Sequence, residues 1–148
     1  MVARQVRVNL DQFDPNWHEC YVIVRTKPVS ERLKYETDME DISTQLSELQ
    51  RKLYDVGNAI DNTILSEAED AKKLKIQSIK LRGEAMALTE KIYDTLKDLI
   101  KSAVVSGLIF DVDKQSKIPF AKEHIDELDT EVLGYIRQYI FDGTSKND

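Results

Sequence analysis

Residues 35–60 read YETDMEDISTQLSELQRKLYDVGNAI, and the spacing of their apolar side chains determines the expected architecture. Apolar residues recur at alternating intervals of four and three: Tyr35, Met39, Ile42, Leu46, Leu49, Leu53, Val56 and Ile60. Two apolar positions in every seven residues form a narrow stripe along a helix, which is typical of coiled coils and helical hairpins. We therefore expect a long helix that contacts another helix along this seam.

A second helix is expected from about Glu67 to Ser106, with Gly107 ending it. Its apolar positions include Leu74, Ile79, Leu81, Ala85, Leu88, Ile92, Leu96, Leu99 and Ala103. Adjacent helices usually pair, so the simple arrangement is a helical hairpin over residues 30–106 with its reversal within 57–70. The narrow stripe also leaves open a second reading, in which part of the apolar surface contacts another chain.

The two ends of the chain indicate a small β part. Within residues 1–28, Val6 and Val8 alternate with polar residues, and FDPN provides a turn into a second strand from Trp17 to about Thr26. Residues 107–148 predict a short strand, a polar turn, a second strand and helices. The expected fold class is mainly α with a small β part: an N-terminal β-hairpin, two long antiparallel helices forming a coiled-coil-like arm, and a short C-terminal β-turn and helices, packed as a single domain.

Composition and charge narrow the classes of function. A formal net charge of −6 with a pI of about 5.0 disfavours nonspecific binding to nucleic acid, which requires clustered positive charge. No apolar run approaches the about 20 residues that span a bilayer, and the N-terminus lacks the apolar core of a secretory signal. One cysteine allows no internal disulfide. We expect a cytoplasmic protein that binds neither nucleic acid nor membrane.

Only one pair of residues suggests chemistry. His18 and Cys20 are two apart in a predicted strand, which would place both on one face. A structural zinc site needs four ligands, and the chain has one cysteine and two histidines. The segment DVDKQSK at 111–117 begins like a calcium loop but lacks its later positions. Glycine-rich phosphate loops and nucleophile motifs are absent from the sequence. We expect no catalytic, cofactor or metal site, and hence no enzyme.

The remaining candidate is the apolar helix surface. Residues expected to form the helix seam or to contact a partner are Met39, Ile42, Leu46, Leu49, Leu53, Val56, Leu88, Ile92 and Leu99. Amphipathic helices are bound by apolar stripes or grooves on other helices. The expected activity is therefore binding of a helical protein, which could be a client or a second copy of the chain.

Two stretches carry a resemblance to a known family. They are WHECYVIVRTKPVSER at 17–32 and SGLIFDVDKQSKIPFAKEHIDELDTEVLGYI at 106–136. Together they resemble small phage tail assembly chaperones, in which a W-x-x-V-R-x-P-[ST] opening and a G-x-x-IPF-[ST]-x-E-x-IDxL ending recur. The likeness covers roughly the first 30 and the last 40 positions. Lys27 stands as an extra residue before Pro28, and Ala121 replaces the expected Ser or Thr.

The resemblance implies a function for the helix surface. Such a chaperone coats the long, helical tape measure protein in the infected bacterial cytoplasm and keeps it soluble before tube polymerisation. The alternative is a coiled-coil homo-oligomer with a structural or regulatory role, including a phage inhibitor of a host protein.

Overall fold

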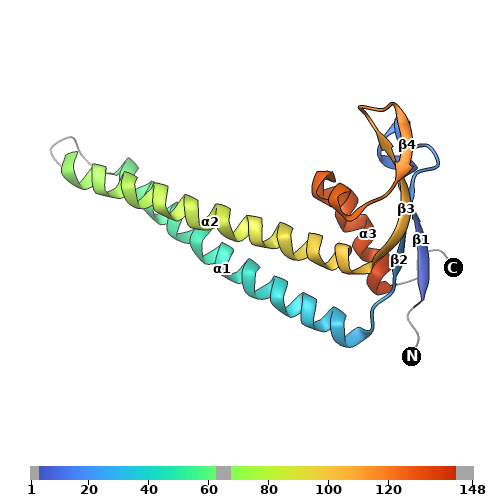
Figure 1. The fold of residues 1–148 in the computed structure, drawn as a ribbon. Helices are drawn as coiled ribbons and strands as arrows, with labels where there is room; N and C mark the ends of the chain where they lie inside the picture. Colours follow the sequence, from blue (N-terminus) through green and yellow to red (C-terminus); the bar gives the residue numbers. More distant parts are fainter. Residues whose placement is uncertain (1–3, 63–67, 143–148) are drawn as a thin grey trace. The chain divides into compact units, whose positions relative to one another are not determined.

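The computed structural model describes residues 4–62 and 68–142, which divide into two compact units (Figure 1). Among the described residues, unit 1 comprises 4–35 and 94–142, and unit 2 comprises 36–62 and 68–93. These boundaries differ from the segments 1–28, 30–106 and 107–148 expected from the sequence, because strands from both ends of the chain join in one sheet. That the whole chain packs as a single domain stays a prediction.

Unit 1 is built on a four-stranded antiparallel sheet in the order β1-β2-β3-β4. The strands are β1 (Gln5–Asn9), β2 (Tyr21–Arg25), β3 (Val104–Asp111) and β4 (Ser116–Pro119). The first two form the expected N-terminal hairpin, with Val6 opposite Val24 and Val8 opposite Val22. The second hairpin, β3 and β4, joins the first through antiparallel pairing of β2 with β3.

One face of this sheet forms the core of unit 1. The valines of β1 and β2 are buried there, as their alternation with polar residues predicts. They pack in one cluster with the last turns of α2 (Ala68–Ala103) and with α3 (Thr130–Asp142). Buried members from these helices are Leu96, Ile100, Ala103, Val132, Leu133, Ile136, Tyr139 and Ile140. Asp129 begins α3 by accepting a hydrogen bond from the backbone N–H of Val132 (3.1 Å).

The expected end of the second helix at Ser106, next to Gly107, is wrong. The helix ends at Ala103 and β3 begins at Val104, since this residue pairs with Val24 of β2. Gly107 lies inside β3, where a Cβ would collide with the backbone oxygen of Tyr21 and come within 3.0 Å of Phe120. Its role is therefore to let β2 and β3 approach closely, rather than to end a helix.

The connection between β1 and β2 is longer than a simple turn. Two short 3-10 helices, η1 (Asp11–Phe13) and η2 (Pro15–Trp17), occupy it, and Asp14 Oδ1 accepts the N–H of Asn16 (2.8 Å). The second strand consequently begins at Tyr21 rather than at the expected Trp17. A further 3-10 helix, η4 (Lys122–Glu127), leads from β4 towards α3.

Unit 2 is an antiparallel pair of helices (Figure 1). It comprises Glu36–Asp61 of α1 (Val29–Asp61) and Ala68–Tyr93 of α2. Side chains buried in it are Ile42, Val56, Ser78 and Leu81. The first two belong to the seam expected from the sequence. The expected reversal at 57–70 falls partly on residues 63–67, which lie outside the described residues.

These features confirm the expected fold class, mainly α with a small antiparallel sheet and two long helices. Across residues 4–62 and 68–142, no helix combines the length and the apolar character needed to cross a membrane.

Candidate protein-binding groove

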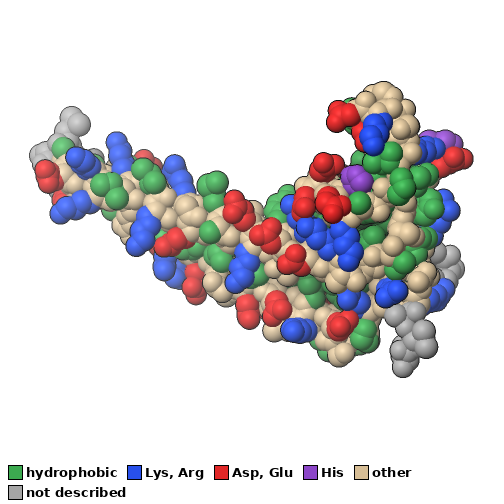
Figure 2. Space-filling view, in the orientation of Figure 1, with side chains coloured by type: hydrophobic (Ala, Val, Ile, Leu, Met, Phe, Trp, Pro, Cys, Tyr) green, Lys and Arg blue, Asp and Glu red, His purple; other side chains and the backbone are tan. Residues whose placement is uncertain are grey.

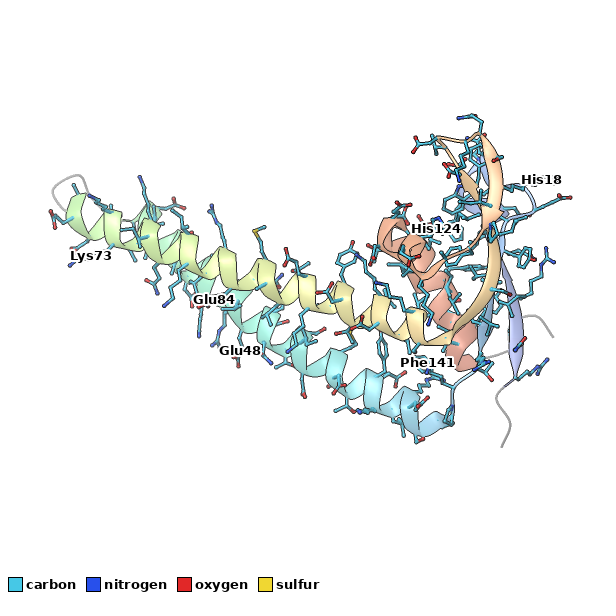
Figure 3. All side chains as sticks on the ribbon, viewed as in Figure 1. His18, Glu48, Lys73, Glu84, His124 and Phe141 are labelled. Carbon is cyan, nitrogen blue, oxygen red and sulfur yellow. The ribbon has the colours of Figure 1, made fainter. Side chains whose placement is uncertain are left out.

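A groove lies between the two helices of unit 2, with a volume of about 460 Å³. Its lining comes from both helices: Gln45, Glu48, Leu49, Lys52, Glu84, Ala87, Leu88 and Lys91. Figure 3 shows Glu48 on α1 and Glu84 on α2 in the middle part of the pair. The groove thus joins two segments that are some forty residues apart in the chain.

The periodicity of the two helices explains why these residues meet. On α1 the lining residues occupy positions 45, 48, 49 and 52, and on α2 they occupy 84, 87, 88 and 91. Both sets have the spacing i, i+3, i+4, i+7, which places all four members on one side of a helix. Each set contains a seam leucine, Leu49 or Leu88, with polar residues beside it.

The chemistry of the lining suits an amphipathic helix. Leu49, Ala87 and Leu88 offer apolar contact, and both leucines are only partly buried. Two carboxylates and two lysines surround them, so the groove can pair with either sign of charge on a ligand. An apolar strip with charged borders is the form of a helix-binding groove.

The expected partner residues separate into three groups. Ile42 and Val56 are buried in unit 2. Those that are partly buried in unit 2 are Met39, Leu46, Leu49, Leu53, Leu88 and Ile92. Leu99 belongs to unit 1, where it packs against the core. Only Leu49 and Leu88 line the groove.

Sequence reasoning missed the other six lining residues. All six stand one residue before a position of the apolar stripe, as Glu48 does before Leu49 and Ala87 before Leu88. The residues that precede the stripe positions by one form a set that identifies this side of each helix. What the sequence did not indicate is which of the two flanks forms the groove.

The expectation that His18 and Cys20 share one face of a strand is wrong. Glu19 between them has a positive φ of 65°, and both residues precede the strand. The His18 side chain is 78% exposed, as its place in Figure 3 illustrates, whereas Cys20 is 1% exposed. Burial raises the pKa of the Cys20 thiol, which makes the reactive thiolate scarcer. The two side chains therefore do not converge on one ligand.

A second cavity, of about 370 Å³, lies in unit 1 between the β3–β4 turn and η4. Its polar groups are largely engaged in local structure: Asp111 Oδ1 accepts the N–H groups of Asp113 and Lys114, which closes the turn. His124 Nδ1 accepts the N–H of Ala121 (2.8 Å). Within the described ranges, His, Cys, Asp and Glu side chains form no group of three able to hold a metal ion.

Two polar pairs in unit 1 have shifted pKa values. The hydrogen bond between the hydroxyls of Tyr135 and Tyr139 (3.0 Å), together with burial, raises the pKa of Tyr135 to about 12. The hydrogen bond from Lys101 (2.9 Å) lowers the pKa of Asp126. The tyrosine pair lies within α3, the lysine–aspartate pair joins α2 to η4, and neither pair borders the groove.

Comparison with known proteins gives no relative: no family model, curated protein or solved structure matches the chain with significant similarity.

Proposed function

We propose that the protein is a chaperone for phage tail assembly, which holds the helical tape measure protein soluble before the tail tube polymerises. The observation that carries this proposal is the groove of unit 2, because its partly buried leucines and charged borders match the needs of an amphipathic client helix. A tape measure protein is a long helix, so many copies can bind along one client.

The resemblance to tail assembly chaperones supports the choice of client. Both resembling stretches, 17–32 and 106–136, fall in unit 1, whereas the groove belongs to unit 2. The proposal therefore joins two independent features: a sequence likeness in one unit and a helix-binding surface in the other.

Co-expression with the tape measure protein encoded in the same genome tests the proposal. The wild-type chain should keep the tape measure protein soluble and co-purify with it at many copies per client. Ala87→Arg is the informative variant, because Ala87 is exposed and lines the groove. Arg is a good helix former, so it obstructs the groove without unfolding the helix.

Thr44→Arg is the matched control. Thr44 is equally an exposed helix residue of unit 2, and it stands two residues after the buried Ile42, on the outer side of α1. We expect Ala87→Arg to lose the client and Thr44→Arg to retain it. Equal capture of the client by both variants would show that the groove is not the client-binding surface. A wild-type chain that leaves the tape measure protein insoluble would favour the homo-oligomeric alternative.

A further inference from the structure

Unit 2 exposes large apolar side chains away from its groove. Tyr54 of α1 and Ile76, Ile79 and Met86 of α2 are between 60% and 68% exposed. Single exposed apolar residues are common, whereas four of them on one helix pair suggest a docking surface. We refer to these four residues as the apolar face.

Helix geometry separates Tyr54, Ile79 and Met86 from the groove. Each residue turns an α-helix by about 100°. On α1, the groove-lining Glu48 and Lys52 each stand one residue before a seam leucine, whereas Tyr54 follows Leu53 by one. The two flanks of the seam therefore point to opposite sides of the helix pair, so Tyr54 and the groove lie on different sides.

The same rule holds for Ile79 and Met86 of α2. Ile76 is the exception: it stands eleven residues, or about three turns, before Ala87 and so points in nearly the same direction as that groove residue. Ala87 precedes Leu88 and lines the groove, whereas Met86 follows Ala85 and Ile79 follows the buried Ser78. Ile76, Ile79, Gly83 and Met86 have intervals of three, four and three, which is the repeat of a second seam. Gly83 has no side chain and nothing within 4 Å of a Cβ built there, so it leaves this strip open.

The flank of α1 that bears Tyr54 carries no charge over residues 43–57. The residues that follow the seam positions by one are Ser43, Ser47, Gln50, Tyr54 and Gly57. Those that precede the same positions by one are Asp41, Gln45, Glu48, Lys52 and Asp55. On α1, charge is thus kept off the middle of the side that carries Tyr54, whereas the same flank of α2 carries Lys75 and Arg82. Depletion of charge is the compositional mark of an interface core.

The distribution of charge along the helix pair indicates what binds the apolar face. Residues 36–48 and 84–93 contain seven carboxylates and one lysine, and we call them the acidic end. Residues 49–62 and 68–83 contain seven basic and four acidic residues, and we call them the basic end. Figure 2 shows blue side chains concentrated towards the part of unit 2 where α2 begins and red ones more frequent further along the pair.

We propose that the apolar face of unit 2 docks on the same face of a second copy, with the two helix pairs antiparallel. The basic end of each copy then lies over the acidic end of the other, whereas a parallel arrangement would bring like charges together. A two-fold axis generates this contact from one self-complementary patch. The groove stays open on the outside, so a dimer can still hold a client.

The available area fits a stable dimer. The α2 segment Ala68–Tyr93 is about 39 Å long at 1.5 Å per residue, and two helices side by side are about 20 Å wide. Contact over the full side of unit 2 would therefore cover about 800 Å² on each copy, which is the standard size for a specific interface.

Sedimentation equilibrium of the full chain tests the dimer. We expect the wild type to dimerise and Ile79→Glu/Met86→Glu to weaken the dimer at least 100-fold. Val112→Glu is the matched control, since Val112 is 69% exposed and lies in unit 1. Circular dichroism confirms that each variant is folded. A wild type that is monomeric at all concentrations, or a double variant that dimerises as well as the control, would overturn the proposal.

Salt and charge reversal test the orientation. The wild-type dimer should weaken at high salt, because opposite ends attract only in the antiparallel arrangement. Reversing Lys75 and Arg82 to Glu should weaken self-association, as should reversing Glu36 and Glu40 to Lys. Each of these four residues follows a position of the apolar stripe by one, so all four share the flank that bears Tyr54, Ile79 and Met86. A mixture of the two variants should form a heterodimer. A wild-type dimer that strengthens with salt, or a mixture that stays monomeric, would refute the antiparallel arrangement.

Discussion

Gly107→Ala gives the sharpest test of the sheet that unites the two ends of the chain. The added Cβ would collide with the backbone oxygen of Tyr21 and lie 3.0 Å from both Phe120 Cβ and Val22 Cα. Two of these neighbours are backbone atoms, so β3 must move away from β2. Overpacking of this kind costs about 1–3 kcal/mol. The displacement also strains the hydrogen bond from Phe120 N–H to the Gly107 oxygen (3.0 Å), for a further net cost of about 1 kcal/mol.

We therefore expect Gly107→Ala to lower the free energy of unfolding of unit 1 by about 2–4 kcal/mol. Urea unfolding followed by the fluorescence of Trp17, the sole tryptophan, reports on this unit. Gly134→Ala is the matched control: Gly134 is in α3, with nothing within 4 Å of a built Cβ. Alanine there should stabilise by about 0.5–1 kcal/mol. A Gly107→Ala variant that is as stable as the wild type, or more stable, would refute the close approach of β2 and β3.

Further predictions concern the helix seam and the tyrosine pair. Ile42→Ala should lower the free energy of unfolding by about 2–5 kcal/mol, because Ile42 is 4% exposed. Leu46→Ala should lower it by about 1–2 kcal/mol, because Leu46 is only partly buried. Equal losses for the two variants, measured by urea unfolding followed by circular dichroism, would contradict this difference in burial. The pKa of Tyr135, raised from 10.0 to about 12, favours the neutral hydroxyl in the folded state. The stability that this shift contributes is complete below pH 10 and is lost as the pH rises towards 12. The free energy of unfolding of Tyr135→Phe should therefore fall less steeply with pH over that window than that of the wild type.

Local patterns predicted the elements well, for identifiable reasons. Alternation at Val6 and Val8 indicated a strand with one buried face, and both residues are buried in β1. The seam from Met39 to Val56 indicated one long helix, which α1 contains without a break. Both patterns depend on the period of a single element, which neighbouring residues specify.

Features that depend on distant segments were not predictable in the same way. Val104 continues the helical pattern of α2, yet its pairing with Val24 draws it into β3. Leu99 has the spacing of Leu88, but it packs against the core of unit 1 instead of joining the groove. In each case the deciding contact lies far away in the sequence. The same limit applied to the groove, where periodicity gave its two leucines but not which flank of each helix accompanies them.

Hydrogen–deuterium exchange with and without the tape measure protein tests the central claim, that the groove of unit 2 holds the client. We predict added protection in two separated segments, 45–52 and 84–91, because these supply the lining of the groove. Protection confined to unit 1, or no protection while the client is bound, would contradict the account.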